Sequence, residues 1–283
     1  MKNKLKSIIY YILVLFLIAY IYFNFSDNST KTDNNNLIVS YIDVGQGNGV
    51  LIQNGKENIV IDGGDKSNSD KFVSFLKSRK VSNIKYMVAS HYDSDHISGL
   101  IEAMDQFNIE NIINPGYSKD SQTYKDFVKK RKSTNAKIIV PNIHDEFYVD
   151  DLKIKVVGPT SYDMSEENDR SIVLKLTYGN TSFLFPGDAV KQSESSMIYT
   201  GENLKSDVLM LGHHGSKYST NDFFLDEVNP KIAIISVGEN NRYNHPSKAV
   251  LSKLKSRNIQ VFRTDKDGDI ILESDGKNIR KIE

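Results

Sequence analysis

Short apolar runs bounded by glycine, asparagine and aspartate recur along most of the chain, a pattern typical of buried β-strands. The predicted strands are residues 37–45, 49–54, 57–64, 84–90, 171–179, 181–188, 206–212 and 230–238. Helical apolar spacing instead predicts helices at 71–80, 220–228 and 247–256. Each half opens with consecutive strands and continues with alternating strands and helices, which predicts an α/β fold with two central sheets and helices outside.

The N-terminal segment has a different pattern, because the 19 residues 7–25 are mostly apolar and carry no charge. A helix of about 20 apolar residues spans a bilayer, so residues 1–25 are predicted to be a cytoplasmic stub and a transmembrane anchor. Lys2, Lys4 and Lys6 predict that the rest of the chain is extracellular. A cleaved signal sequence is the alternative, and it exports the same domain in secreted form.

The residues after this apolar segment are polar. Residues 26–36 lack apolar periodicity, which is typical of a linker. No second break of this kind follows, so residues 37–283 are predicted to form one domain.

Composition narrows the chemistry. The chain has 36 basic and 36 acidic residues, so no global positive field indicates bulk nucleic-acid binding. The absence of cysteine excludes disulfides, thiolate zinc sites and a cysteine nucleophile. The basic run at 125–132 is interpreted as the solvated face of a helix, with contacts to backbone phosphates as the alternative.

The sequence SHYDSDHISGL at residues 90–100 places His91, Asp93, Asp95 and His96 within six positions. In an extended loop, side chains at i, i+2 and i+4 point the same way. Three of these residues can therefore face one cavity, while His96 adds a fourth ligand from the start of the following helix. Imidazole and carboxylate together suit Zn²⁺, Mn²⁺ or Fe²⁺. An ordinary polar loop is the alternative.

Similar residues directly follow other predicted strands. Asp62, His91, Asp188 and His213 each come just after an apolar run. Because strand ends converge on one rim in layered α/β folds, we expect these side chains to be neighbours.

The histidines are concentrated in such motifs. His213 and His214 lie between glycines in GHHGS, and His245 lies in NRYNHP, whereas His144 belongs to no motif. Adjacent histidines cannot easily both face one metal. We therefore expect one of the pair to be a ligand and the other to support a ligand or contact the substrate.

Seven stretches follow one another in the chain: YIDVGQGNGVLI, IDGG, SHYDSDHISGL, NDRSIVLKL, FPGDA, LGHHGSKYS and SVGENNRYNHP. In this order they resemble the metallo-β-lactamase superfamily, and more narrowly the hydrolase domain of bacterial competence proteins of the ComEC type. The resemblance implies an αββα sandwich of two mixed sheets with helices on both outer faces. It also implies a rim site for one or two divalent metal ions, zinc or manganese.

The metal ligands implied by the resemblance are His91, Asp93, Asp95, His96, Asp188 and His213. His91 and Asp93 are expected to hold the first ion, Asp95 and His96 the second, and Asp188 to bridge the two.

One expected ligand has no counterpart. No histidine matches the superfamily's middle ligand between His96 and Asp188, and NDRS offers Asn168 and Asp169 instead. Fewer histidines and more carboxylates favour Mn²⁺ or Fe²⁺ over zinc.

The residues expected to support the ligands or to contact substrate are Asp43, Asn48, Asp62, Asn168, Ser216 and Lys217. Among them, Asp62 resembles the buried aspartate that orients the ligand loop from behind. Lys217 and Lys191 are expected to contact backbone phosphates.

Together these features predict an exported, membrane-anchored, metal-dependent hydrolase, and the resemblance implies a phosphodiesterase or nuclease that acts on DNA. A metal-bound hydroxide, oriented by Asp95, is expected to attack the phosphorus, and His214 or His245 to protonate the leaving group. Besides DNA and the membrane, a competence-type channel protein is an expected partner, because the one predicted span cannot form a channel itself.

Two alternatives stay open at this stage. Loops rather than folds set substrate choice, so a lactone, a β-lactam or a small phosphodiester can replace DNA. The missing middle histidine also fits a non-catalytic accessory protein with a degenerate metal site.

Overall fold

The computed structural model describes residues 36–283, which form one compact unit. The predicted anchor at 7–25 and nearly all of the predicted linker lie outside these residues. Among the described helices, none is long and apolar enough to cross a membrane.

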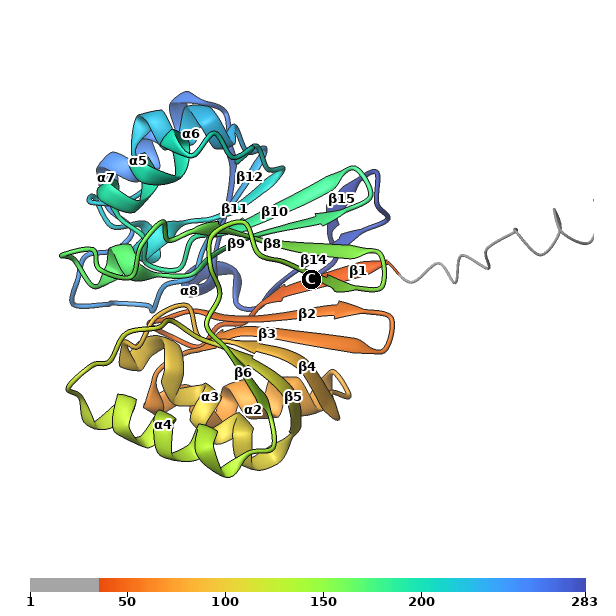
Figure 1. The fold of residues 1–283 in the computed structure, drawn as a ribbon. Coiled ribbons are helices and arrows are strands. Elements are labelled where there is room, and N and C mark those ends of the chain that lie inside the picture. The colour runs from red at the N-terminus through yellow and green to blue at the C-terminus, as the bar shows by residue number, and fades with distance from the viewer. Residues whose placement is uncertain (1–35) are drawn as a thin grey trace, which may run out of the picture. The chain divides into compact units, whose positions relative to one another are not determined.

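Two mixed sheets lie at the centre of this unit (Figure 1). Within residues 36–283 the first sheet has eight strands, in the order β15 (Ile279–Lys281), β14 (Ile270–Ser274), β1 (Leu37–Tyr41), β2 (Gly49–Asn54), β3 (Glu57–Gly63), β4 (Asn83–Val88), β5 (Asn108–Ile113) and β6 (Lys137–Ile139). The second has seven, in the order β13 (Gln260–Arg263), β12 (Ile232–Ile235), β11 (Val208–Met210), β10 (Thr181–Phe185), β9 (Val173–Tyr178), β8 (Leu152–Gly158) and β7 (Glu146–Val149).

Helices cover the outer faces of both sheets (Figure 1). On the first sheet these are α2 (Ser69–Ser78), α3 (Ser94–Gln106) and α4 (Gln122–Ser133), and on the second α5 (Lys191–Tyr199), α6 (Asp222–Val228) and α7 (Lys248–Ser256). Short helical turns complete the unit: η1 (Lys66–Asn68), η2 (Asn168–Arg170), η3 (Gly212–Gly215) and α8 (Thr264–Asp267). The predicted αββα sandwich of two mixed sheets is thus confirmed.

The strands read as nearly continuous apolar runs because both of their faces are buried. In β2, Val50 and Ile52 point into the core between the sheets, whereas Leu51 packs under the outer helices. In β3, Ile59 enters the core between the sheets and Val60 the outer one. The period of two along each strand therefore supplies two apolar layers from one sequence run.

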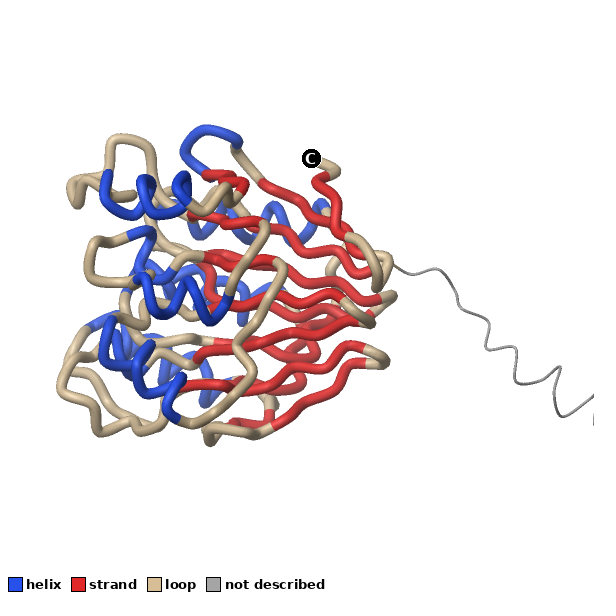
Figure 2. The backbone as a smooth tube through the Cα atoms, turned by 90° about the horizontal axis from the view of Figure 1, so that it is seen from above, coloured by secondary structure: helices blue, strands red, loops and turns tan. Residues whose placement is uncertain are grey.

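The parallel strand pairs determine where the chemical residues meet. Strands β3 and β4 run parallel, as do β10 and β11. The loops that follow their carboxyl ends gather at one end of the sandwich, and tight turns close the other end (Figure 2). The motif residues lie in the loops of that first end.

Candidate metal centre

The first motif bridges the end of β4 and the start of α3. His91 follows the strand, Asp93 is the residue just before α3, and His96 lies in the first helical turn. Both histidines are fully buried, and their ring centroids are 4.1 Å apart. The change from strand to helix therefore brings two imidazoles from opposite ends of the motif together.

Asp62, at the end of β3, fixes the orientation of this motif. Its Oδ1 accepts a hydrogen bond from the Ser90 backbone N–H at 2.8 Å. Its Oδ2 accepts from Ser90 Oγ at 2.7 Å and from His96 Nδ1 at 2.8 Å. Ser90 Oγ also lies 3.0 Å from His91 Nδ1. Each ring is therefore bonded through Nδ1, which leaves Nε2 directed toward Asp188, as ligating histidines are usually held.

Asp188 lies at the centre of the histidines. It follows β10 and is nearly fully buried. Its Oδ1 is 3.3 Å from His96 Nε2, and its Oδ2 is 3.8 Å from His91 Nε2 and 3.7 Å from His214 Nε2. The carboxylate therefore faces three imidazole nitrogens at once.

His214 completes the cluster from the second sheet. Its Nδ1 donates to the Ser236 carbonyl at 3.0 Å, and its Nε2 lies 3.4 Å from Asp95 Oδ2. His213 and His214 have φ values of 50° and 55°, a left-handed conformation that is uncommon outside glycine and is often found at functional sites. This backbone conformation turns the His214 ring inward.

The resemblance implied His213 as the late ligand, and the geometry instead favours His214. The His213 side chain is 27% exposed, and its Nε2 is 3.9 Å from Asp188 Oδ2. Its Nδ1 lies 3.3 Å from the Asn168 amide nitrogen, and neither group of close ligand atoms in the described residues contains this histidine. The sequence alone could not show which of the two histidine rings points into the cluster, because that depends on the left-handed backbone of both residues.

The cluster contains buried polar atoms that the described residues leave without a hydrogen bond. Within the described residues, His91 Nε2, His96 Nε2, His214 Nε2 and Asp188 Oδ1 are buried and have no hydrogen-bond partner. Leaving one such group unpaired costs about 1–3 kcal/mol. Two groups of ligand atoms are close enough to share an ion, because the atoms within each group lie within 4.8 Å of one another. They are His91 with His96 and Asp188, and Asp95 with His96 and His214. These residues fit a divalent metal ion.

The carboxylates and imidazoles of the cluster shift one another's pKa values. Burial alone raises the pKa of Asp188, but the His96 and His214 rings hold it well below its usual range. The pKa of Asp95 is likewise lowered against its burial, through the bond to His214 and the charge of His96. Burial and then the His96 ring lower the pKa of His91. Against their burial, Asp188 raises the pKa of both His96 and His214. The cluster thus offers two ionised carboxylates and a neutral His91, whereas His96 and His214 would give up a proton when a metal binds.

Profile comparison agrees with this geometry. The profile of the metallo-beta-lactamase superfamily matches residues 42–239, more than half of the chain. The chain belongs to the metallo-β-lactamase superfamily. Its fold supports a metal-dependent hydrolase, and the family implies divalent metal ions at this centre.

Competence proteins are among the relatives of this metallo-β-lactamase-family chain. It is 31% identical to ComE operon protein 3 of Bacillus subtilis over 253 residues, 82% of this chain and 32% of that protein. It is 30% identical to competence protein ComA of Neisseria gonorrhoeae over 237 residues, 83% of this chain and 32% of that protein. The resemblance to competence proteins is confirmed, and the chain spans about a third of the length of these relatives.

A solved structure has the same fold. The metallo-beta-lactamase fold protein YhfI from Bacillus subtilis superimposes with a TM-score of 0.57 at 14% identity, over 84% of this chain and all of that one.

The first ion position of the superfamily is altered here. Asp93 Oδ2 is 3.8 Å from His91 Nε2, but its Oδ1 is bonded to Lys119. Where the superfamily has a middle histidine, Asn168 turns toward His213. Asp169 instead accepts backbone N–H groups at the start of α5, from Val190 and Ser193, at 3.1 and 2.9 Å.

The loop between β1 and β2, residues 42–48, lies against the first motif, but Asp43 in this loop adds no ligand to the cluster. That carboxylate pairs with Lys71 at 2.6 Å. Asn48 is buried, and its backbone N–H donates to the Asp95 carbonyl at 3.2 Å. Gly47, at φ 123°, is required here because a Cβ would lie 2.0 Å from that carbonyl oxygen.

Three further residues from the sequence analysis, Ser216, His245 and His144, lie in different surroundings. Ser216 is buried and accepts from the Tyr218 N–H at 3.3 Å, which stabilises the turn after the histidine pair. Burial, followed by the charges of the neighbouring histidines, lowers the pKa of His245 to about 4, so this ring is neutral at pH 7. His144 is exposed and bonded to Glu202, apart from the centre.

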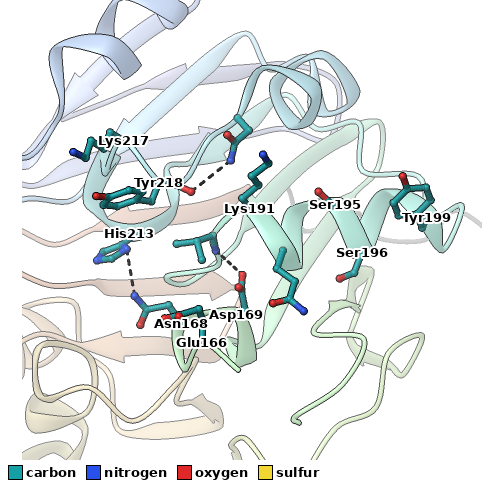
Figure 3. A pocket seen from close by; sticks show the side chains of 13 residues that line it. Glu166, Asn168, Asp169, Lys191, Ser195, Ser196, Tyr199, His213, Lys217 and Tyr218 are labelled. Carbon is teal, nitrogen blue, oxygen red and sulfur yellow. Dashed lines mark hydrogen bonds between the residues drawn. The ribbon is translucent and has the colours of Figure 1, made fainter. Parts of the chain in front are cut away.

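One open cleft, with a volume of about 940 Å³, is lined by His213, which neighbours Asp188 of the metal centre. Figure 3 shows Lys191 and Tyr199 on α5 along one side and His213, Lys217 and Tyr218 along the other. The basic run at 125–132 lies on α4 and does not line this cleft.

A second cleft, of about 1070 Å³, shares His213, Lys217 and Tyr218 with the first. Tyr243 and His245 belong to its lining. The two clefts therefore meet beside the metal centre and together form a continuous surface.

Several residues at the centre were missed from sequence. Ser90 directly precedes the first motif, so its position gave a usable signal. Ser236, Lys119 and Tyr243 gave none, because they come from loops and strands whose approach to the centre depends on the packing of the two sheets.

Proposed function

We propose that this chain is a metal-dependent phosphodiesterase that cleaves DNA outside the cell, anchored to the membrane by residues 7–25. The observation that carries the proposal is the group of unpaired, buried ligand atoms beside two adjoining open clefts. Small-molecule sites usually enclose most of the ligand. Two adjoining open clefts at His213 favour a polymer.

The chain's own residues divide the work of hydrolysis. A divalent cation in such a centre supplies an activated water at neutral pH and stabilises negative charge on the substrate. Asp95, held 3.4 Å from His214, faces the cavity and orients the nucleophile. His213 and His245 line the clefts, so we assign them to the leaving-group side.

Cationic side chains support a phosphate-bearing substrate. Over residues 36–283, Lys191 and Lys217 have no carboxylate partner, and both line a cleft. Each phosphate contact of this kind makes binding weaken with salt, by a slope of about 0.7 per contact for single strands.

Exposed aromatic rings support nucleobases on that substrate. Tyr218 and Tyr243 are 62% and 48% exposed, and both line the clefts beside the centre. Lys217 Nζ lies 4.9 Å from the Tyr218 ring centroid, and Arg242 lies equally far from that of Tyr243. Paired tyrosines and cations suit stacking on bases next to backbone phosphates.

The relatives support the biological setting. One of them is named a competence protein. Together with the resemblance to ComEC-type proteins, this supports DNA as the substrate and a channel-forming protein as the partner.

A nuclease assay tests the activity. The full chain, supplied with Mn²⁺ or Zn²⁺, is incubated with single- and double-stranded DNA beside an Asp95→Ala, His96→Ala double variant. We expect metal-dependent cleavage that the double variant loses. His144→Ala is the matched control, because it removes a histidine that lies apart from the centre.

Two results contradict the proposal in different ways. Metal bound stoichiometrically without DNA cleavage, together with hydrolysis of lactones or small phosphodiesters, moves the activity to another substrate. Purification without metal, and no gain of activity on adding it, points to a non-catalytic accessory protein.

Export and anchoring need a separate test. We expect the chain to fractionate with membranes and to be digested by protease added to intact cells, and deletion of residues 2–25 to abolish both. A soluble, protease-protected full chain contradicts this part of the proposal.

A further inference from the structure

Lys119 pairs with Asp93, one of the two residues that the resemblance assigns to the first metal ion. It comes from the loop between β5 and α4, and its ammonium group pairs with the carboxylates of Asp93 and Glu167, the latter at 2.8 Å. One carboxylate belongs to the metal motif. The other immediately precedes Asn168, which stands where the middle histidine is missing.

This bridge is held in place from several sides. The Lys119 side chain is 23% exposed and that of Asp93 35%. Tyr117 Oη donates to Glu167 at 3.3 Å, and the Arg170 guanidinium lies 5.2 Å from the centroid of the Tyr117 ring. A lysine that is paired twice and largely covered is a fixed positive charge rather than a mobile surface group.

The remaining donors describe one ion rather than two. Both groups of close ligand atoms contain His96, whose Nδ1 is bonded to Asp62, so that only Nε2 can ligate. One nitrogen binds one ion. Around His91 the remaining donors are one oxygen each of Asp93 and Asp188, both 3.8 Å from its Nε2, and no third histidine lies there among the described residues.

We propose that Lys119 supplies the positive charge of the first metal position, and that the chain binds a single divalent ion among Asp95, His96, Asp188 and His214. A second ion on Asp93 would share a carboxylate with the ammonium group and be repelled by it at close range. This inference rests on metal binding at the proposed active centre, but not on the nature of the substrate.

Counting bound ions tests the inference without measuring activity. The full chain is titrated with Mn²⁺ by calorimetry and analysed for metal content, and the Mn²⁺ electron paramagnetic resonance spectrum is recorded. We expect one ion per wild-type chain with the spectrum of an isolated ion. Lys119→Met keeps the length of the side chain and removes its charge. We expect this variant to bind two ions with a spin-coupled spectrum, the second about 10-fold or more tighter than any second ion on the wild type.

Two variants serve as controls. Lys119→Arg keeps the charge and is expected to bind one ion. Lys125→Met removes an exposed lysine that pairs with Asp120 on the protein surface, and it too is expected to bind one.

Two ions on the wild-type chain overturn the inference, whether or not Lys119→Met folds. A folded Lys119→Met variant that still binds one ion, with wild-type circular dichroism, overturns it as well. No bound ion on the wild type contradicts both this inference and the metal-dependent hydrolase proposed above, so the two failures are distinguishable.

Discussion

Asp62 gives the sharpest test of how the fold prepares the metal centre. It accepts three hydrogen bonds of 2.7–2.8 Å, from the backbone and side chain of Ser90 and from His96 Nδ1. Asp62→Asn keeps the size of the side chain but replaces one acceptor oxygen with an NH₂ group. If the NH₂ group takes the place of Oδ2, it faces two other donors, Ser90 Oγ–H and His96 Nδ1–H. His96 can remove its part of this donor–donor repulsion only by moving its proton from Nδ1 to Nε2.

The expected loss of metal affinity follows from this proton, because it occupies the nitrogen that would bind the ion. A ring protonated on Nε2 cannot ligate through that nitrogen, and losing such an orienting partner typically weakens metal binding by about 10–100-fold. That range corresponds to about 1.4–2.7 kcal/mol. The buried donors left facing the amide also destabilise the fold, by about 1–3 kcal/mol each.

Calorimetric titration with Mn²⁺ measures the affinity, and thermal unfolding of the metal-free protein measures the stability. The matched control is Asp207→Asn. Asp207 Oδ2 also accepts from a serine N–H and Oγ, those of Ser182, both at 3.1 Å, but it contacts no histidine. We expect the control to lose stability and keep its metal affinity. A folded Asp62→Asn variant whose affinity stays within about twofold of wild type refutes the reasoning.

Three further predictions follow from the same geometry. His214→Ala should weaken Mn²⁺ binding at least about 10-fold. His213→Ala should leave Mn²⁺ affinity nearly unchanged and raise the KM for DNA. Equal losses of Mn²⁺ affinity in the two variants would contradict the assignment of His214, rather than His213, to the metal centre. Gly47→Ala should destabilise the protein in urea unfolding by about 2 kcal/mol or more, because its Cβ would lie 2.0 Å from a backbone oxygen. Gly201→Ala is the control. Its Cβ would have no atom within 4 Å, so the variant should lose only the stability that the strain of a left-handed backbone costs. Chelation should lower Tm by about 5–10 °C, since an ion at 100 times its Kd contributes about 2.7 kcal/mol; a Tm unchanged by chelator would mean that the folded state binds no ion.

The centre shows why two sheets are needed to build it. His91, His96 and Asp62 come from the first sheet, and Asp188 and His214 come from the second. Because each ring is bonded through Nδ1 to its own sheet or loop, the unpaired nitrogens meet only when the sheets pack. Metal binding is therefore expected to stabilise the packed arrangement of the two halves.

The sequence by itself determined much of this protein. Runs buried on both faces, such as those of β2 and β3, made the central strands visible, and their order indicated two central sheets with helices outside. The loop from His91 to His96 and the placement of Asp62 and Asp188 after strands also followed, because local spacing and strand direction decide them. Short or partly polar strands such as β6 and β7 were missed, since their pairing depends on neighbours rather than on their own pattern.

Only the tertiary structure decided the rest. Whether His213 or His214 faces the metal depends on two consecutive left-handed residues, which the residue types do not specify. Asp169 could be read as a substitute ligand until the structure showed it holding the start of α5. Lys119 reaches Asp93 and Glu167 from a separate loop. Such pairings arise because side-chain direction is fixed by backbone angles and long-range packing, and neither is encoded in the spacing of a motif.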